Sequence, residues 1–216
     1  LKEMSFNGFK KLINVELNTL PYLEKLGFDD MLPSDEDVAL TSMVISNCPL
    51  IDKVTFNVSS DNYKVAFLEG AKLDLGGMYS VTTIESNASI KGLETLIIPI
   101  STKELKFTAT YGDGVSDIKS IWSSNAHHLD DGFVGIDLKD VNLTYLDMSS
   151  LRITNGINFH ISPTSQHPHL NTYRDGVEMP YFTPSGSMDL TNYKSENIQA
   201  MYKGLDFSKF KVTAPP

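Results

Sequence analysis

The chain has one cysteine and very little arginine, and each shortage excludes a class of protein. Cys48 stands alone, so neither a disulfide framework nor a cysteine-rich metal site can form within the chain. The only arginines, Arg152 and Arg174, are too few for a typical phosphate-binding surface. With 18 basic residues against 27 acidic ones the formal charge is −9, so the backbone of a nucleic acid would be repelled.

Long apolar runs are absent too, although hydrophobic residues are not scarce. No run approaches the roughly 20 apolar residues that cross a bilayer, so we expect no transmembrane segment. Hydrophobic residues still make up 41 % of the 216 residues. That share is enough for a packed core and too high for a disordered tail. The length suits one domain or one continuous repeat array.

An 11-residue repeat runs through much of the chain. Apolar residues recur at the first, fourth and sixth positions of each unit. The first three units carry Leu1, Met4 and Phe6, then Leu12, Val15 and Leu17, then Leu23, Leu26 and Phe28. Later units, with small phase slips, begin at Leu40, Ile51, Asn62, Val81, Leu93, Phe133, Leu143 and Tyr202. A series in phase is not a chance match, so the repeat indicates a structural unit.

The spacing inside each unit predicts a short β-strand. The fourth and sixth positions are two residues apart and point to one face of a strand, whereas the fifth points to the other. The fifth position is polar in the clearest units: Ser5, Glu16, Thr55, Glu85, Asp137, Asp147 and Asp206. The units are rich in Val, Ile, Phe and Thr and are interrupted by Gly, Pro and Asn, which argues against helices.

Two units together predict one coil of a solenoid. Eleven residues are too few for a closed coil, so we expect about 22 residues per coil. Each coil then has two apolar blocks, one on each side of a flattened superhelix, and neighbouring coils pair as parallel strands. The predicted fold is mostly β, a parallel-stranded solenoid with irregular loops. Because Asn after a strand suits a turn, stacked turns would align Asn7, Asn18 and Asn57 along one edge.

The repeated pattern resembles leucine-rich repeats, and most of all the irregular bacterial surface type called BspA-like. Residues 12–17, 146–149 and 205–210 carry the resemblance best. The resemblance implies a curved solenoid with a parallel sheet on its concave face. It also implies an exported or surface-anchored protein that serves in adhesion or protein recognition.

We expect a single repeat array over residues 1–212, with an irregular loop region at 162–195 and the start of a linker at 213–216. The closing Thr-Ala-Pro-Pro segment is typical of a stiff spacer. The first unit has no polar cap of the kind that ends a repeat array. We therefore expect further repeats or domains at both ends, and an export signal outside this chain.

Candidate metal ligands lie in polar stretches without a known ligand spacing. Two pairs of histidines, at 127 and 128 and at 167 and 169, have none of the i, i+4 spacing of a zinc-binding helix. The acidic turns at 34–37 and 111–117 lack the pattern of an EF-hand loop or a calcium-binding β-roll. We expect no metal and no other cofactor.

A catalytic site is disfavoured for similar reasons. Glycoside cleavage needs two carboxylates flanking the scissile bond, and many polysaccharide-cleaving enzymes are β-solenoids. The outward acidic residues could line such a face, but a spaced acidic stripe is also typical of an ordinary solvated sheet. No Gly-x-Ser-x-Gly or P-loop motif is present, and Cys48 takes an apolar position in its unit. We expect the chain not to be an enzyme.

The favoured function is a non-catalytic binding or adhesion module of an extracellular or cell-surface protein. Its partner would be a protein or glycan on a host or neighbouring cell, bound through the polar strand face. The predicted partner-binding residues are Asn14, Glu16, Lys53, Thr55, Lys64, Asp137, Tyr145 and Asp147. Tyr22 and Trp122 lie off the apolar phase and are further interface candidates. Two alternatives stay open: a β-helical element of a phage tail or fibre, and a polysaccharide-cleaving enzyme.

Overall fold

The computed structural model describes the chain almost continuously up to residue 128 and as separate segments beyond it. The described residues are 1–8, 14–35, 37, 42–114, 116–128, 132–133, 135–138, 140–141, 145–147 and 150. After residue 150 only strand backbones are described, so the predicted irregular region 162–195 is seen only at four short strands. The unit predicted at Tyr202 lies outside the described residues, and the last strand ends at Thr213, inside the predicted linker.

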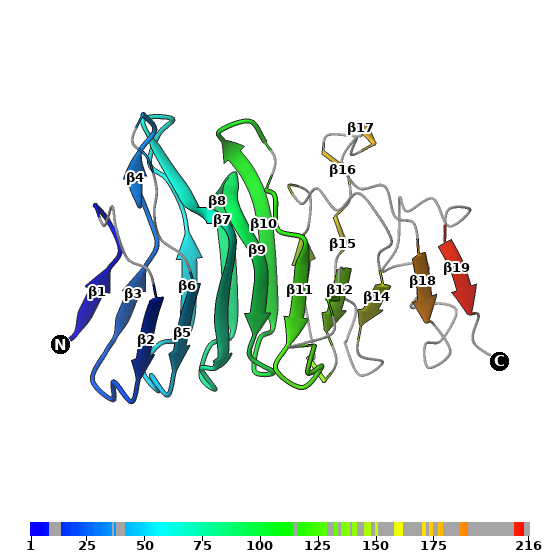
Figure 1. Ribbon diagram of the computed structural model, residues 1–216, viewed down its shortest axis with the longest axis horizontal. Coiled ribbons are helices and arrows are strands. Elements are labelled where there is room, and N and C mark those ends of the chain that lie inside the picture. The colour runs from blue at the N-terminus through cyan, green and yellow to red at the C-terminus, as the bar shows by residue number, and fades with distance from the viewer. Residues whose placement is uncertain are drawn as a thin grey trace.

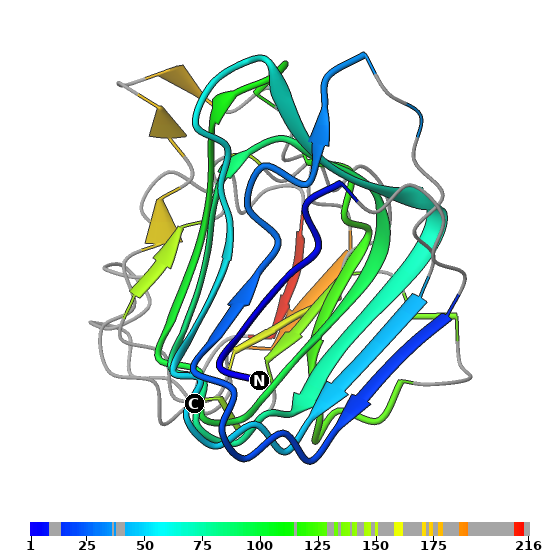
Figure 2. The ribbon, with the colours of Figure 1, turned by 90° about the vertical axis from the view of Figure 1, so that its left-hand side faces the viewer.

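Two parallel sheets run along the molecule, as predicted for a solenoid with two apolar blocks per coil, and sheet B extends beyond the last strand of sheet A (Figure 1). In sheet A the strands follow the order β1 (Glu3–Ser5), β3 (Lys25–Gly27), β6 (Lys53–Phe56), β8 (Thr83–Ala88), β10 (Glu104–Tyr111), β13 (Tyr145–Asp147) and β15 (Leu170–Asn171). Every pairing in this sheet is parallel. Seen from its N-terminal end, the molecule shows the two sheets as separate walls with the interior between them (Figure 2).

Sheet B forms the second wall and is likewise parallel. Its strands follow the order β2 (Asn14–Asn18), β5 (Ser42–Ser46), β7 (Tyr63–Gly77), β9 (Ile90–Ile98), β11 (Ser120–Ser123), β12 (Gly135–Leu138), β14 (Asn158–Ile161), β18 (Gly186–Asp189) and β19 (Phe210–Thr213). Two antiparallel additions complete the strands: β4 (Leu32–Pro33) pairs with the start of β7, and β16 (Tyr173–Arg174) pairs with β17 (Val177–Glu178). The mostly β, parallel-stranded solenoid is therefore confirmed.

Coil length varies around the predicted value. Met4 pairs with Leu26, which lies 22 residues on, whereas Val54 pairs with Ile84, 30 residues on. The longer coils contain insertions, such as the acidic segment after β4. The shortest step joins β11 directly to β12 within sheet B. The repeat therefore sets the strand pattern, and insertions at the corners set the length of each coil.

The interior next to sheet A is a stack of aromatic rings. The rings of Phe6 and Phe28 lie 5.0 Å apart and those of Phe28 and Phe56 lie 4.9 Å apart, both in stacked geometry. Each of the three side chains is at most 2 % exposed. The next coil carries Ser86 instead, and its hydroxyl lies 2.9 Å from the carbonyl oxygens of Phe56 and Ala88, which share its single proton. The sixth position of the repeat therefore builds the core, as predicted.

Side-chain amides and carboxylates link the coils where the strands of sheet A end. The Asn57 backbone N–H donates to Asp29 Oδ1 at 2.7 Å, and the Asn87 N–H donates to Asn57 Oδ1 at 3.0 Å. Asn57 is thus in an edge ladder, as expected, but its neighbours are Asp29 and Asn87. Asn18 ends a strand of sheet B, because consecutive units alternate between the two sheets.

Candidate functional site

The outer surface of sheet A, called face A below, presents a regular polar surface. It consists of the outward side chains of β1, β3, β6, β8 and β10. Along β6, Val54 and Phe56 point inward and are fully buried, so Lys53 and Thr55 point outward. The same alternation places charged and hydroxyl side chains outward on the neighbouring strands.

Ion pairs join the charged residues of face A. Lys25 Nζ lies 2.9 Å from Glu3 Oε1 on the adjacent strand, and Lys53 pairs with Glu85 on another. Hydrogen bonding to Lys25, reinforced by its charge, lowers the pKa of the Glu3 carboxyl, and the same contact raises the pKa of Lys25. Face A therefore presents both charge signs in a fixed arrangement.

Hydroxyl hydrogen bonds link neighbouring coils across face A. Thr55 Oγ1 donates to Asp29 Oδ2 at 2.9 Å, and Thr108 Oγ1 donates to the Ser86 carbonyl oxygen at 3.1 Å. Each bond crosses from one coil to the next. A partner would therefore meet a surface whose polar groups are already positioned.

The outer side of sheet B is different, because part of it is covered. Glu16 on β2 is exposed and Val44 on β5 is 44 % exposed, but Ile97 on β9 and Trp122 on β11 are 2 % and 3 % exposed. The register pairs these positions side by side across the sheet. Outward apolar side chains are therefore buried on β9 and β11, and on β11 the segment that follows the strand packs against Trp122 through His128.

His128 holds this covering segment in place. Its ring stacks on Phe133 at 4.0 Å and meets Trp122 edge-on at 5.8 Å. Its Nε2 lies 2.8 Å from Asp137 Oδ2 on β12. Asp137, one of the predicted partner-binding residues, is thus engaged by a side chain of its own molecule. This cluster is a small second core outside the main interior.

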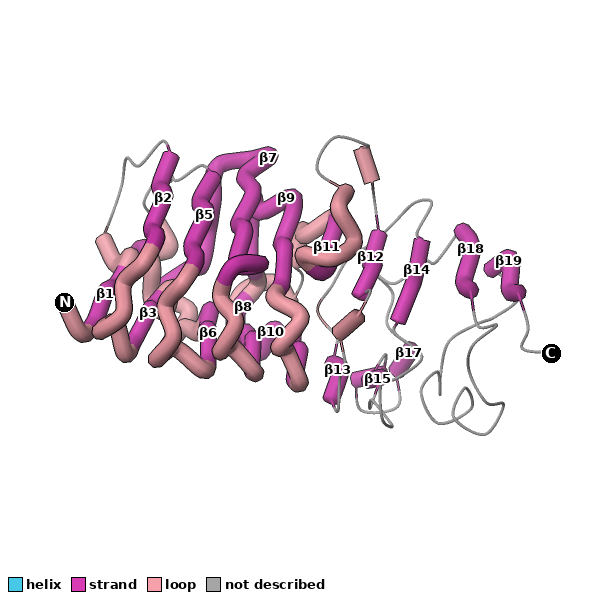
Figure 3. The backbone as a smooth tube through the Cα atoms, turned by 90° about the horizontal axis from the view of Figure 1, so that it is seen from below, coloured by secondary structure: helices cyan, strands magenta, loops and turns pink. Residues whose placement is uncertain are grey.

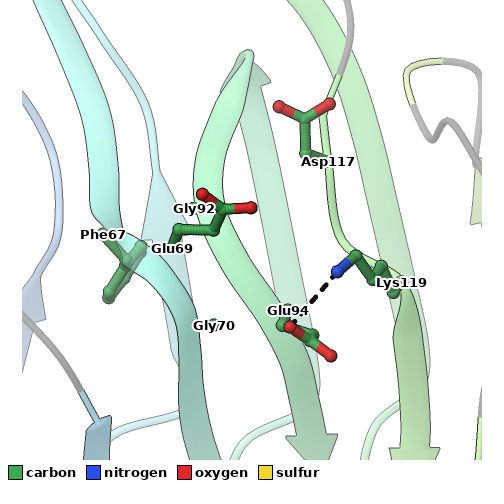
Figure 4. Close-up of a pocket in the computed structure, with 7 residues that line it drawn as sticks. All are labelled: Phe67, Glu69, Gly70, Gly92, Glu94, Asp117 and Lys119. Atoms are coloured by element: carbon green, nitrogen blue, oxygen red, sulfur yellow. Dashed lines mark hydrogen bonds and ion pairs between the residues drawn. The ribbon is translucent and has the colours of Figure 1, made fainter.

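A hollow opens where β7 bulges away from β9 (Figure 4). Its volume is about 560 Å³, and it is lined by Phe67, Glu69, Gly70, Gly92, Glu94, Asp117 and Lys119. The register shows the bulge directly: Ala66 pairs with Lys91 and Ala71 with Leu93, so four residues of β7 lie opposite Gly92 alone. Gly92 has φ +75°, and a Cβ there would overlap the carbonyl oxygen of Phe67.

Lysines neutralise much of the acidic charge in the hollow. Lys119 Nζ lies 3.3 Å from Glu94 Oε2, and Lys91 Nζ lies 3.4 Å from Asp117 Oδ2. In Figure 4 Asp117 lies apart from Glu94 and Glu69. In the part of the chain that the structure describes, no three His, Cys, Asp or Glu side chains are placed to hold a metal ion. The hollow therefore offers hydrogen-bonding groups to a polar ligand.

The eight predicted partner-binding residues are divided between opposite sides of the molecule. Sheet A carries Lys53, Thr55, Tyr145 and Asp147, and sheet B carries Asn14, Glu16 and Asp137. The side chains of Tyr145 and Asp147 are not among those described. Lys64 lies at the start of β7 beside β4, where its Nζ donates to the Ser34 carbonyl oxygen at 3.3 Å. The structure thus groups Lys53 with Thr55 and Asn14 with Glu16, on opposite sheets.

The other candidates from the sequence have structural roles. Cys48 is 1 % exposed, and burial raises the pKa of its thiol. The acidic turn at 111–117 contributes Asp113, which pairs with Lys91 at 2.9 Å. His127 is exposed beside His128, and residues 167–169 lie outside the described part. The described residues include no helix long and apolar enough to span a bilayer.

Most residues of the hollow were not among the candidates from the sequence; the exception is Asp117, which belongs to the acidic turn at 111–117. Glu69, Glu94 and Lys119 belong to no repeat position with an assigned role. Gly70 and Gly92 were the available signal, because an isolated glycine inside a strand often marks a bulge or a close backbone contact.

Comparison with known proteins identifies no relative: no protein-family model, no curated protein and no solved structure matches the chain.

Proposed function

We propose that this chain is a non-catalytic binding module of an exported or cell-surface protein, of the leucine-rich-repeat-like kind, and that face A binds its partner. The partner is a protein or glycan on a host or neighbouring cell, and the charge pattern of face A favours a protein. Side chains of both signs set the orientation and the rate of protein association more than its strength.

One observation carries this proposal: face A is polar, ordered and continuous over five neighbouring strands. Lys53 and Thr55 lie in its middle; Lys53 pairs with Glu85 on the adjacent strand β8, and Thr55 donates to Asp29, just beyond the end of β3. The surface is held by the backbone ladder of the solenoid, so binding would cost little conformational entropy.

The test compares the two groups of predicted residues. A double variant, Lys53→Ala with Thr55→Ala, should lose binding to an array of purified extracellular and cell-surface proteins by about tenfold or more. The matched control, Asn14→Ala with Glu16→Ala, changes two outward polar residues on the opposite sheet and should bind normally. Loss of binding in the control alone would contradict the assignment of face A.

A second candidate is a structural shaft of a tail or fibre assembly. The observation that favours it is that strands line both sides of the superhelix, whereas the leucine-rich-repeat resemblance implies one sheet on a concave face. Sedimentation equilibrium separates the two, because we expect a shaft to trimerise and the binding module to stay monomeric.

The third candidate is a polysaccharide-cleaving enzyme, which would use either the outward acidic residues of the strands or the carboxylates of the hollow. Glu94 is paired with Lys119 and Asp117 with Lys91. We expect no hydrolytic turnover on panels of glycans and peptides. Turnover that Glu94→Gln abolishes would contradict the non-catalytic proposal.

A further inference from the structure

Four tight turns lie side by side along the edge where sheet B passes into sheet A. Figure 3 shows the loops from β2, β5, β7 and β9 to the strands of sheet A stacked in a row. Each turn closes with a backbone hydrogen bond between its fourth and first residues. The donor and acceptor pairs are Leu23 and Leu20, Ile51 and Cys48, Val81 and Met78, and Thr102 and Pro99, at 3.1 to 3.2 Å.

Each turn buries its last residue and exposes an apolar residue at its tip. Leu23, Ile51, Val81 and Thr102 are at most 1 % exposed. The exposed tips are Tyr22 at 73 %, Leu50 at 51 %, Tyr79 at 72 % and Ile100 at 38 %. We call these four side chains the corner ridge. They account for half of the large hydrophobic residues that are exposed among the described residues.

The backbone under the corner ridge is held on both sides. On the sheet A side, the Thr82 N–H donates to the Asp52 carbonyl oxygen at 2.8 Å and the Lys103 N–H donates to the Thr82 carbonyl oxygen at 2.7 Å. On the sheet B side, the Leu20 N–H donates to the Asn47 carbonyl oxygen at 3.2 Å. The backbone beneath the exposed side chains is therefore fixed, so a ligand would not have to order the turns themselves.

The corner ridge carries no charge, and neutral hydrogen-bonding side chains lie on its sheet B side at the first two turns. None of the sixteen residues in the four turns is charged. Immediately before the first two turns, Thr19 Oγ1 donates to Asn18 Oδ1 at 2.8 Å and Asn47 Nδ2 donates to Thr19 Oγ1 at 3.0 Å. Apolar rings beside amides and hydroxyls suit an uncharged ligand that has both apolar faces and hydroxyl groups.

The width of the corner ridge indicates the shape of the ligand. The corner ridge presents one exposed large hydrophobic side chain per turn, whereas a stable protein interface buries about 800 Å² on each partner and takes roughly 20–30 residues. Adjacent parallel strands are about 4.8 Å apart, so Tyr22 and Tyr79, two coils apart, are separated by about 10 Å along the axis. A long, thin, regularly repeating molecule fits this row better than a globular surface does.

We propose that the corner ridge binds a neutral linear polysaccharide that lies along the solenoid axis, with sugar rings stacked on Tyr22 and Tyr79. The apolar faces of the sugar rings would contact the tyrosines, Leu50 and Ile100, and sugar hydroxyls would reach Asn18, Thr19 and Asn47. The acidic protein, with a net charge of −9, would repel an anionic polymer. This site is separate from face A and goes beyond the function proposed for that surface.

Sedimentation of the whole chain with insoluble cellulose, chitin and β-1,3-glucan tests the proposal. The unchanged chain should sediment with at least one of the three polymers, and a soluble oligosaccharide of the same polymer should compete. Tyr22→Ser combined with Tyr79→Ser should weaken binding by about tenfold or more, because two stacking surfaces are lost. Both tyrosines are over 70 % exposed, so circular dichroism and the thermal midpoint should stay unchanged.

Two controls make the outcome decisive. Tyr63→Ser removes another exposed tyrosine at the start of β7, away from the corner ridge, and should bind the polymer normally. The Lys53→Ala and Thr55→Ala double variant of face A should also bind it normally. Failure to sediment with any of the three polymers would overturn the proposal, as would retained binding by the double tyrosine variant or equal loss with Tyr63→Ser.

A protein contact at the same place would give a different result. If the corner ridge joined two copies of the chain, sedimentation velocity would show concentration-dependent dimers that the double tyrosine variant abolishes, and the polysaccharide proposal would be wrong. Normal polymer binding with loss of protein binding only in the face A variant would support both proposals independently.

Discussion

Both sheets of this solenoid are built from the same repeat, but sheet A follows it more regularly than sheet B does. Sheet A has a ring stack inside and solvated ion pairs outside, repeated from coil to coil. Sheet B has aliphatic residues inside, a strand bulge at Gly92, and an outer side that is partly buried around Trp122. Regularity therefore produces a flat polar surface on one side, and insertions produce a hollow and a second small core on the other.

The largest expected effect comes from the ring stack of sheet A. Phe28→Ala removes a fully buried ring that contacts Phe6, Phe56 and Phe67, and should lower the free energy of unfolding by about 4 kcal/mol. Ile45→Ala makes a cavity on the sheet B side and should cost less, about 3 kcal/mol. Urea denaturation measures both. A larger loss of unfolding free energy for Ile45→Ala than for Phe28→Ala would show that the aromatic stack does not contribute more to stability than the sheet B side of the core.

Two glycine variants at the strand bulge of sheet B separate the effect of a close backbone contact from that of a positive φ alone. Gly92→Ala places a methyl group against the Phe67 carbonyl at a positive φ, and should destabilise the chain by about 3 kcal/mol. Gly70→Ala also sits at a positive φ, but its nearest neighbour is Glu94 Oε2 at 3.8 Å, so about 1 kcal/mol is expected. Thermal unfolding of the two proteins side by side measures the difference. Equal losses would mean that the close backbone contact does not limit this bulge.

The covered part of sheet B depends on His128. His128→Ala removes a stacked ring and the partner of Asp137, and should cost about 1 to 2 kcal/mol. Trp122 is the single tryptophan, so its emission reports on the cover directly and should shift to longer wavelength. His127→Ala, at the exposed neighbouring residue, is the matched control and should leave the emission unchanged. An unshifted spectrum in His128→Ala would show that other contacts hold the segment.

The smallest effect is expected at the exposed end of face A. The pKa of Glu3 is lowered in the folded chain, so the stability it contributes is present at neutral pH and is lost as the pH falls through that lowered value. The pKa of Lys25 is raised, so its contribution is lost as the pH rises through the raised value. Glu3→Gln should remove the acidic dependence, and salt should weaken the pair in the unchanged chain. Thermal midpoints measured against pH in low and high salt check this. A midpoint that is independent of salt would contradict it.

The repeat was the most reliable prediction from the sequence, because the apolar positions of each unit have to be buried. Val54 and Phe56 had to share one face and Lys53 and Thr55 the other, since successive side chains of a strand alternate. The repeat pattern did not predict β10, although its Leu105 and Phe107 are spaced like the apolar residues of the other units. Their unit opens with Thr102, a buried polar residue, where the pattern required an apolar one. Because Thr102 is polar, the sequence pattern did not reveal that this position is buried in the core.

The grouping of residues into the proposed binding surfaces could not be predicted from the sequence. The predicted partner-binding residues formed one polar set in the sequence but lie on two opposite sheets, because consecutive units alternate between the walls. Tyr22 was recognised as an exposed aromatic, but nothing in the chain placed it in line with Tyr79, more than fifty residues away. The bulge of β7 opposite Gly92 could be recognised only once the pairing of β7 with β9 was known.

The amino-acid sequence alone determined that the chain is built of short strands with one buried and one solvated side, stacked in parallel coils. That much follows from local alternation and from the need of each unit to bury its apolar residues against the next. Only the tertiary structure decided which units share a sheet, where the surface is hollow and which turn tips form a row. These features depend on the register between residues that are 20 to 30 positions apart, and insertions in the corners change that register without altering the pattern of any single unit.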